Sequence, residues 1–452
     1  MTATAPPHHP SLADPHLTDP SLTDPLLADL HLTDLHPSLA DPAMTSMNLL
    51  NEISIRYPQA VSFAAGRPAE QFFELAAVHR HLDRYVGHLR AERGLSEEAA
   101  RRQLLQYGRT KGIIHELIAE YLTVDEGIEV PAESIVVTVG CQEAMFLTLR
   151  ALRRGPEDVL LAVSPTYVGL TGAALLADLP VRPVADGPDG LDLADLRRQS
   201  AAARAEGLRP RALYLVPDVA NPSGASLPLE LRRELLAVAA EEDFLILEDN
   251  PYGVFAGEQR LPSLKALDTA RRVVHLGSFA KTALPGARVG YVVADQLVAD
   301  GAGGTALLAD LLGMIKSMTT VNTSPIAQAV IGGALLEHGF RLRAANSEVA
   351  ALYRRNLALV LDGLARRFPP GGGVSWNEPR GGFFLVLTVP CVVDDALLEL
   401  SASRYGVIWT PMCHFHPGAG GERQLRLSVS QVDPATVDRG LDGLAALIAD
   451  RS

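Results

Sequence analysis

The chain has 452 residues, of which 53 are Asp or Glu and 40 are Lys or Arg, so its formal net charge at pH 7 is −13. This acidic balance, without a basic run, argues against a nucleic-acid-binding protein, because affinity for the phosphate backbone comes from concentrated Lys and Arg. Hydrophobic residues make up 47% and charged residues 21%, which excludes disorder along the whole length and lets the chain bury a large core.

The small number of cysteines indicates a reducing compartment, and the absence of a long apolar run or a signal peptide indicates a protein that stays in the cell. We therefore predict a cytoplasmic location. The three cysteines, Cys141, Cys391 and Cys413, are spaced for neither a disulfide framework nor a CxxC metal site. No apolar run approaches the roughly 18 residues that span a bilayer, and the N-terminus lacks the basic-then-apolar order of a signal peptide. We therefore predict no bound metal and no membrane partner.

The first 46 residues differ in character from the rest. Between residues 11 and 42, Leu and Asp recur with Pro about every five residues, as in SLADPHLTDPSLTDP. This period matches neither a helix nor a strand, and each Pro removes a backbone donor. We predict a disordered tail over residues 1–46. A true start at Met44 or Met47, or an extension without function, is favoured over a binding role.

From about Met47 onward, apolar runs alternate with amphipathic segments, which is typical of βα units around a mainly parallel sheet. The predicted strands are rich in Val, Ile and Leu and mostly lack polar alternation, as expected for strands covered on both faces. They are Ile135–Val139, Val159–Val163, Ala212–Val216, Phe244–Leu247, Val273–Leu276 and Val289–Val293. Helices are predicted at Glu143–Arg153, Leu229–Glu241 and Ala306–Lys316.

Beyond about Phe340 the pattern changes. A long helical pattern runs through Arg367, a Pro–Gly break follows at Pro369–Gly373, and strands are predicted near Phe383–Leu387 and Gln424–Val429. We interpret the chain as an α/β protein in which residues 75–339 form a large domain, and residues 47–74 and 340–452 form a smaller α+β domain. No repeat of 20–50 residues indicates a solenoid.

Ligands of open α/β sheets bind outside the carboxyl ends of the strands, so polar residues that follow predicted strands are the first candidates for a site. Gly140 follows a strand and opens a helix, where free N–H groups and the Gln142 side chain would cradle a phosphate. Tyr167 follows the next strand and would stack on a ring, although packing is the commoner role of a single tyrosine. Asn221, in NPSG, is by itself only a turn residue.

Two further segments contain candidate catalytic residues. Asp249, in LEDNPYG, would pair with a protonated ring nitrogen if buried, and Tyr252 would bond a neighbouring phenolic oxygen, although Asp before Pro and Gly is more often a turn residue. Lys281, in GSFAKTALPGARVG, lies among small and apolar neighbours, where burial would lower its pKa and make the amine nucleophilic. Ser278 and Arg288 flank this lysine and would hold a phosphate.

Together, the order Gly-Cys-Gln, Tyr, Asn-Pro-x-Gly, Asp-x-x-Tyr and Ser-x-x-Lys-x6-Arg resembles the fold-type I aminotransferases that use pyridoxal 5′-phosphate. The resemblance runs from about Asn48 to the C-terminus. It implies an aspartate-aminotransferase-like fold whose large, cofactor-binding domain holds a mainly parallel seven-stranded sheet. The branch most resembled contains 2-aminoadipate and kynurenine aminotransferases and the aminotransferase-like half of certain bacterial regulators.

The resemblance also implies catalytic and cofactor-binding roles. Lys281 would hold the cofactor as a Schiff base and remove the substrate α-proton, and Asp249 would pair with the pyridine nitrogen. Tyr252 and Asn221 would bond the ring oxygen, and Tyr167 would stack on the ring. The phosphate would be held by the backbone and side chains of Cys141, Gln142, Ser278 and Arg288.

Three further residues complete the implied site. Tyr107, in LLQYGRTKG, resembles the tyrosine that family members contribute to the phosphate site of the neighbouring subunit, which implies a homodimer. Arg426, in LRLSVS, resembles the arginine that grips the substrate α-carboxylate, aided by Asn221 and by the backbone near Gly66. Cys141 departs from the Ser or Ala that relatives often have, which weakens a side-chain contact to the phosphate but not the backbone contribution.

Longer blocks, including Tyr107–Ala119, Glu133–Met145 and Gly277–Asp295, resemble the transaminases of nonribosomal peptide antibiotic pathways that make 3,5-dihydroxyphenylglycine and 4-hydroxyphenylglycine. This resemblance implies an arylglyoxylate acceptor and L-tyrosine or L-phenylalanine as amino donor. Apart from Arg426, Arg67 and Arg109, no residue is a candidate for gripping a distal carboxylate, which favours an aromatic substrate.

Three alternatives remain. One is an aminotransferase of the 2-aminoadipate, kynurenine or general aromatic type that uses 2-oxoglutarate. Another is the effector-binding module of a regulator, which residues 1–46 disfavour because they hold an acidic, Pro-broken repeat where such regulators carry a basic helix-turn-helix. The last is β-elimination, decarboxylation or oxidation on the same scaffold, since Lys281 and Asp249 serve all of these reactions.

Overall fold

The computed structural model describes residues 30–44, 52–187, 189–257 and 261–451. Its central element is a seven-stranded sheet formed by β2 (Ile135–Thr138), β3 (Asp158–Ser164), β4 (Val181–Ala185), β5 (Arg209–Leu215), β6 (Leu245–Asp249), β7 (Val273–Ser278) and β8 (Gly290–Val293). The strand order is β2-β8-β7-β6-β5-β3-β4. Only β8 runs antiparallel to its neighbours, β7 and β2. The prediction of a mainly parallel α/β sheet is confirmed.

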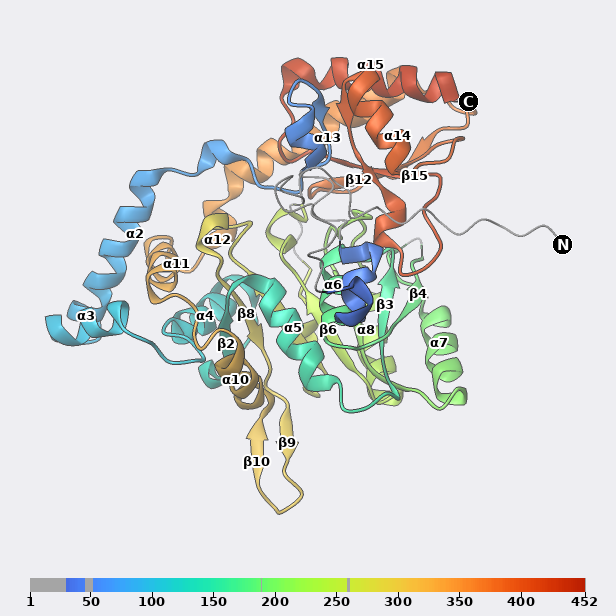
Figure 1. Ribbon diagram of the computed structural model, residues 1–452. Helices are drawn as coiled ribbons and strands as arrows, with labels where there is room; N and C mark the ends of the chain where they lie inside the picture. The colour runs from blue at the N-terminus through green and yellow to red at the C-terminus, as the bar shows by residue number, and fades with distance from the viewer. Residues whose placement is uncertain (1–29, 45–51, 188, 258–260, 452) are drawn as a thin grey trace.

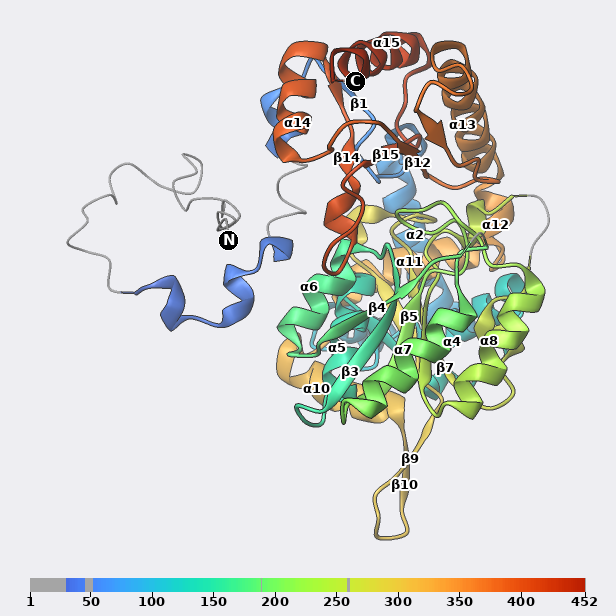
Figure 2. The ribbon, with the colours of Figure 1, turned by 90° about the vertical axis from the view of Figure 1, so that its right-hand side faces the viewer.

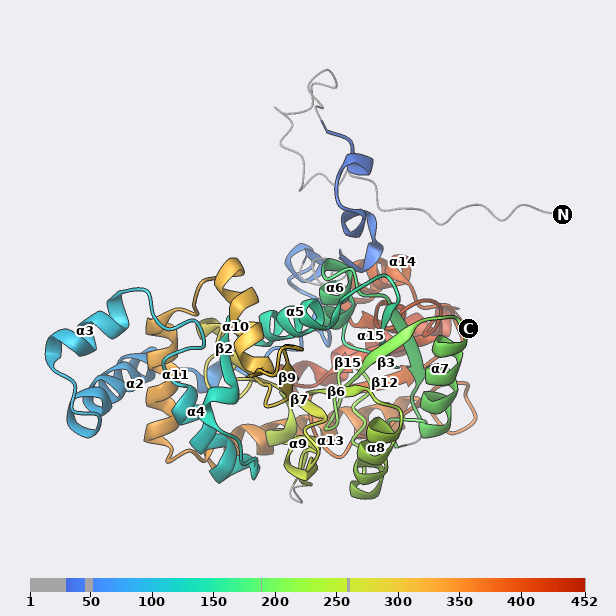
Figure 3. The ribbon, with the colours of Figure 1, turned by 90° about the horizontal axis from the view of Figure 1, so that it is seen from below.

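Helices cover both faces of this sheet (Figure 3). Along β3, Leu160 and Ala162 pack with α5 (Gly140–Leu152), α6 (Val168–Leu176) and α10 (Leu308–Thr319). The alternate residues Leu161 and Val163 point to the opposite face and pack with α7 (Leu193–Ala205), α8 (Leu229–Glu241) and α9 (Leu264–Leu267). Because successive positions enter different cores, the strands are apolar throughout, which is the signal that made them predictable.

A further helical group covers the β2 edge of the sheet (Figure 1). It consists of α2 (Leu75–Gly87), α3 (Glu97–Leu105), α4 (His115–Tyr121) and α11 (Pro325–Glu337). Tyr85, Ile118 and Ile331 of these helices pack with Val137 of β2 and Val293 of β8.

A smaller sheet lies above the large one in the view of Figure 1. Its strands are β11 (Ser375–Trp376), β12 (Phe384–Thr388), β15 (Gln424–Ser428) and β14 (Thr410–Pro411), in that order. It shares an apolar core with α13 (Ser347–Arg367), α14 (Asp395–Leu400) and α15 (Pro434–Arg451). Ile53 and Phe63, from the N-terminal part of the chain, also lie in this core. β1 (Val61–Ser62) pairs in parallel with β13 (Val407–Ile408), and α12 (Leu342–Ala345) precedes α13. The predicted domain bounds stay a prediction.

Two elements differ from the sequence-based expectation. β4 was not predicted because its sequence, VRPVA, contains Arg182 and Pro183; it is an edge strand, where a proline is tolerated. The predicted helix at Ala306–Lys316 begins at Leu308, since residues 305–307 belong to an antiparallel hairpin of β9 (Leu297–Ala299) and β10 (Thr305–Leu307). This hairpin projects away from the rest of the molecule (Figures 1 and 2).

Part of the segment predicted to be disordered has a described structure. Residues 30–44 form three short 3-10 turns, at Leu32–Asp34, Pro37–Ala40 and Pro42–Met44, of which the last lies beside α6 (Figure 2). There His36 Nε2 lies 3.1 Å from Asp178 Oδ1. Residues 1–29, 45 and 46 lie outside the described residues, so their predicted disorder stays a prediction. In the described part of the chain, no helix combines the length and apolarity needed to cross a bilayer.

Candidate active site

A cavity of about 670 Å³ opens at the carboxyl edge of the large sheet. The ends of β2, β3, β5, β6 and β7 and the start of β8 meet at this edge, because β8 alone is antiparallel. The cavity is lined by eleven of the residues predicted from the sequence: Gly66, Cys141, Gln142, Tyr167, Asn221, Asp249, Tyr252, Ser278, Lys281, Arg288 and Arg426. The structure therefore brings together residues that are up to 360 positions apart, from Gly66 to Arg426.

Lys281 lies in the turn that follows β7 and reaches into the cavity. Its Nζ donates to the Gly66 carbonyl oxygen at 2.7 Å. Burial, together with the positive charges of Arg288, Arg426 and Arg67, lowers the pKa of Lys281 to about 8. A substantial fraction of the amine is therefore neutral near physiological pH, which is what a nucleophilic or proton-accepting lysine requires.

Asp249 ends β6 and is only 4% exposed. One carboxylate oxygen accepts from the Tyr214 hydroxyl at 2.7 Å, and the other accepts from the Cys141 thiol at 3.4 Å. Burial raises the pKa of Asp249, and these two donors oppose that rise. Among the described residues, no Lys or Arg forms an ion pair with it, so a cationic N–H from a ligand would meet an uncompensated acceptor.

Tyr214 was not predicted from the sequence, because a tyrosine within the apolar strand ALYL is also what packing alone would produce. The thiol of Cys141 is likewise directed at Asp249 and not at a phosphate. Gln142 Nε2 donates to the Gly169 carbonyl at 2.6 Å, so this side chain is engaged with the backbone. Any contribution of Cys141 and Gln142 to an anion site would therefore come chiefly from their backbone N–H groups.

Gly140 opens α5 with φ +74°, a conformation that favours glycine. A Cβ at this position would lie 2.5 Å from Arg288 Nη2, so glycine lets the guanidinium approach the helix N-terminus. The first N–H groups of α5 have no acceptor within the helix. With Ser278 and Arg288 in the same cavity, this corner combines free donors, a helix N-terminus and a cation, the usual ingredients of a phosphate site.

Arg426, on β15, is the cation of the opposite wall and is 4% exposed. Its Nη1 donates to Asn221 Oδ1 at 2.6 Å and its Nη2 to the Ala64 carbonyl at 2.9 Å. The guanidinium carbon lies 4.3 Å and 4.8 Å from the ring centres of Phe384 and Phe415. Burial lowers the pKa of Arg426 to about 10, and its buried Nε has no hydrogen-bond partner. This unmet donor suits a ligand carboxylate.

Two tyrosines frame the space between these groups. Tyr252 packs edge-on against Phe383 and Phe384, with ring centres 5.2 Å and 5.7 Å away, and burial raises its pKa far above the ordinary value. Burial also raises the pKa of Tyr167 to about 12. Both hydroxyls therefore stay protonated and can donate to a ligand oxygen at any physiological pH.

Tyr107 is the predicted site residue that does not line the cavity. It lies in the loop after α3, and 86% of its surface is exposed. Tyr107 therefore does not contribute to the cavity of its own chain.

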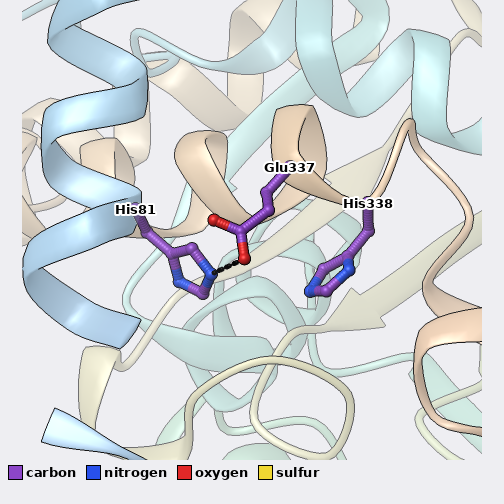
Figure 4. A group of neighbouring side chains, drawn as sticks. All are labelled: His81, Glu337 and His338. Atoms are coloured by element: carbon purple, nitrogen blue, oxygen red, sulfur yellow. Dashed lines mark ion pairs between the residues drawn. The ribbon is translucent and has the colours of Figure 1, made fainter. Parts of the chain in front are cut away.

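A group of possible metal ligands lies elsewhere, where His81 of α2 faces Glu337 and His338 at the end of α11 (Figure 4). His81 Nε2 lies 3.6 Å from Glu337 Oε1. Both oxygens of Glu337 already accept from Arg80 Nε at 3.1 Å. Since a guanidinium already neutralises the carboxylate, we assign this group no ligand.

The cavity thus offers a buried carboxylate without a cationic partner, a buried guanidinium Nε without an acceptor, and an anion corner beside a low-pKa lysine. A ring nitrogen, a substrate carboxylate, a phosphate and an aldehyde would meet these four groups, so the donor set fits pyridoxal 5′-phosphate together with an amino acid. The sequence pattern of the protein family described as aminotransferase class I and II matches residues 86–444. The chain belongs to this family and is a pyridoxal-phosphate-dependent transaminase, as the sequence predicts.

Individual relatives agree with the family. The chain is 55% identical over 417 residues to the (S)-3,5-dihydroxyphenylglycine transaminase of Amycolatopsis orientalis, covering 92% of this chain and 94% of that protein. It is 31% identical to the 2-aminoadipate transaminase of Thermus thermophilus, covering 86% and 92%. The kynurenine aminotransferase of Pyrococcus horikoshii, solved with PMP, superimposes with a TM-score of 0.78 at 26% identity, over 92% of this chain and 96% of that one. The predicted fold-type I architecture and cofactor are confirmed.

Proposed function

We propose that this enzyme moves an amino group from L-tyrosine or L-phenylalanine to an arylglyoxylate and so makes a phenylglycine for antibiotic biosynthesis. The observation that carries the proposal is the 55% identity, over nearly the whole of both chains, to a 3,5-dihydroxyphenylglycine transaminase. The predicted cytoplasmic location stays a prediction.

In this proposal, Lys281 binds the cofactor aldehyde and later moves the proton at the substrate Cα. When bound, pyridoxal 5′-phosphate supplies the carbon that receives the amino group and a ring that takes up the electrons of the broken C–H bond. Asp249 would accept the ring N–H and favour the protonated ring, and Tyr214 and Cys141 hold the carboxylate in place for this. Because Lys281 has a pKa of about 8, it can take up a proton and return it near neutral pH.

The remaining cavity residues orient the two ligands. Tyr252 and Asn221 would hydrogen-bond the ring oxygen, and Tyr167 would restrict the tilt of the ring. Ser278, Arg288 and the first turn of α5 hold the phosphate. Within that turn, the backbone N–H groups of Cys141 and Gln142 would contribute to the phosphate site.

Arg426 binds the α-carboxylate through its unpaired Nε, with the backbone at Gly66 nearby. Its other nitrogens donate to Asn221 and Ala64, so the guanidinium is held in a fixed orientation relative to Lys281. This orientation places the Cα–H bond for proton transfer.

The alternative acceptor is 2-oxoglutarate or 2-oxoadipate, which carries a second carboxylate. One observation favours it: Arg67 also lines the cavity and is near enough to lower the pKa of Lys281. Arg109 plays no such role, because it is engaged with Glu133 and lies 2.8 Å from His115 Nε2.

The two acceptors are separated by single-turnover assays of the enzyme loaded with pyridoxamine 5′-phosphate. We expect 3,5-dihydroxyphenylglyoxylate or 4-hydroxyphenylglyoxylate to react about 10-fold faster or more than 2-oxoglutarate, since a site shaped for an aromatic ring leaves a second carboxylate poorly paired. Faster reaction of 2-oxoglutarate or 2-oxoadipate than of any arylglyoxylate would overturn the proposed acceptor. The matched variant is Arg67→Met. If Arg67 binds a distal carboxylate, this variant lowers the rate with the dicarboxylate relative to the rate with the arylglyoxylate, and otherwise the ratio of the two rates stays unchanged.

We also propose a homodimer in which Tyr107 reaches the phosphate site of the partner. Its 86% exposure is unusual for a tyrosine. Exposed apolar residues occur on α10 and shortly after it: Met314, Met318, Val321 and Ile326. Gly108, next to Tyr107, lies against Asn322 and Pro325, so the loop of Tyr107 and the segment after α10 form one surface.

A further inference from the structure

A buried ion pair lies beside the turn that opens α5. Glu143 is in the first turn of α5, and Lys316 reaches it from α10. Their side chains are 10% and 0% exposed, and Lys316 Nζ lies 2.8 Å from Glu143 Oε2. The hydroxyl of Thr320 accepts from Lys316 Nζ at 2.8 Å and donates to Glu143 Oε1 at 2.6 Å. The three side chains therefore form a closed hydrogen-bonded group.

The same carboxylate holds the backbone that precedes the helix. Glu143 Oε2 accepts from the Val139 N–H at 2.6 Å, and Val139 is the residue before Gly140. A second contact comes from Thr323, whose hydroxyl donates to the Val137 carbonyl at 3.0 Å. The end of α10 and the residues after it thus hold the junction of β2 and α5 at two points.

A carboxylate at this place opposes the binding of an anion. It interacts favourably with the positive end of α5, but a phosphate bound to the first N–H groups of α5 would meet a like charge close by. Lys316 cancels that charge. Burial lowers the pKa of Lys316, and Glu143 acts in the opposite direction and favours its charged form. Without Lys316, a nearly buried carboxylate would be left unpaired beside the phosphate.

We propose that Glu143, Lys316 and Thr320 form a clamp that positions the phosphate-binding turn: Glu143 fixes the Val139 N–H, and Lys316 removes the charge that would repel the phosphate. The inference rests on the proposed placing of the cofactor phosphate at α5. None of the three side chains lines the cavity, so they are positioning residues that act through the backbone and through charge.

The test compares pyridoxal 5′-phosphate with pyridoxal, which has the same ring and aldehyde but no phosphate. The ratio of their dissociation constants, from absorbance titration of the apoprotein, isolates the contribution of the phosphate-binding turn. We expect Lys316→Met to reduce the preference for the phosphorylated form about 10-fold, because a charge stays unpaired. The double variant Glu143→Gln/Lys316→Met should regain most of this preference, since no buried charge remains and the glutamine oxygen still accepts from Val139.

The matched control is Lys265→Met. Lys265 is also buried and paired, with Asp295 at 2.7 Å and Asp268 at 3.5 Å, but its partners lie on neither α5 nor α10. We expect this variant to lose thermal stability and keep the ratio. Thr320→Val keeps both charges and is a second test that does not depend on whether Lys316→Met folds. We expect it to reduce the preference for the phosphorylated form about 3-fold.

An unchanged ratio in both Lys316→Met and Thr320→Val overturns the clamp, and so does a double variant that is no better than Lys316→Met. An equal fall in Lys265→Met would show a general loss of structure and overturn it as well. If the unaltered apoprotein binds pyridoxal as tightly as its phosphate, the proposed phosphate site fails together with the clamp. Failure of the arylglyoxylate assay, in contrast, overturns the proposed substrate alone.

Discussion

At the scale of single residues, the chemistry depends on how burial and like charges act on one amine. Lys281 shares its cavity with three arginines, and burial together with these charges lowers its pKa to about 8. In the proposed site, the same arginines would attract the phosphate and the carboxylate of the ligands, so one set of charges would both recruit the ligands and activate the lysine. This arrangement runs against the net charge of −13, which means that the positive potential is local to the cavity.

The sign of this shift gives a pH prediction. With a pKa of about 8, the charged form of Lys281 exceeds the neutral form by about 10-fold at pH 7, and the neutral form exceeds the charged form by the same factor at pH 9. Attachment of pyridoxal 5′-phosphate to the apoprotein needs the neutral amine, so its rate should rise from pH 7 to 9 and then level off. The rate is measured by borohydride trapping and mass spectrometry of the Lys281 peptide.

A variant tests the cause. Arg67→Met removes one of the three charges and should move this profile to higher pH, whereas loss of the exposed Arg197, which pairs with Glu241 on the surface, should not. A profile that rises only above about pH 10, as for an ordinary lysine, would contradict the assigned pKa.

At the scale of elements, the site is built by the junctions at one edge of the sheet. Gly140 at the start of α5 and Arg288 before β8 both have positive φ, +74° and +52°. The two residues approach so closely that the glycine has no room for a side chain. Because β8 is antiparallel to β7, it begins at the carboxyl edge where β7 ends, and this places Arg288, two residues before β8, on the same side of the sheet as Ser278.

We therefore predict that Gly140→Ala weakens cofactor binding. The added Cβ would lie 2.5 Å from Arg288 Nη2 and must displace the guanidinium. The backbone strain alone should lower the free energy of unfolding by about 1 kcal/mol. The control is Gly94→Ala, which has a similar φ of +66° and no atom within 4 Å of the added Cβ. Gly94→Ala should lose similar stability, seen in urea unfolding, and keep the wild-type affinity for pyridoxal 5′-phosphate, seen in absorbance titration. Equal affinities in the two variants would contradict the steric argument.

The same junctions explain what the sequence could predict. Six of the seven strands were recognisable because both of their faces are buried, and Asp249 and Lys281 were recognisable because they follow such strands. Tyr214 gave no signal, since its hydroxyl matters only through Asp249 on the neighbouring strand. Arg426 could be found only through the family resemblance, because its strand belongs to the other sheet and nothing local shows that β15 reaches the cavity.

At the scale of the whole molecule, the cavity is shared between two cores. Arg426 of the smaller sheet donates to Asn221, which lies in the turn after β5 of the large sheet. The Thr166 N–H donates to the Phe415 carbonyl at 2.7 Å, and Ser164 Oγ lies 3.2 Å from His416 Nδ1. The segment that carries Phe415 therefore crosses from one body to the other (Figure 2). A substrate held by both Arg426 and Lys281 would bridge the same two bodies, so substrate binding should favour their closed arrangement.

The proposed dimer extends the site to a second chain, and hybrid dimers test it directly. A Tyr107→Ala chain keeps Lys281 but lacks the hydroxyl that its partner needs, and a Lys281→Ala chain has the opposite defect. When the two are unfolded together and refolded as a mixture, half of the sites in each hybrid dimer combine an intact Lys281 with an intact Tyr107 from the partner.

We expect those hybrids to bind pyridoxal 5′-phosphate with wild-type affinity at one site per dimer, whereas neither parent does. The supporting measurement is the mass in solution: Met318→Glu places a charge on a side chain that is 86% exposed and should yield monomers by light scattering, because a charge would have to be buried at the interface. Leu297→Glu on the projecting hairpin, 59% exposed, is the control and should stay dimeric. Hybrids without a restored site would show that Tyr107 acts within its own chain or not at all, since subunit exchange is the only way to unite the two intact residues.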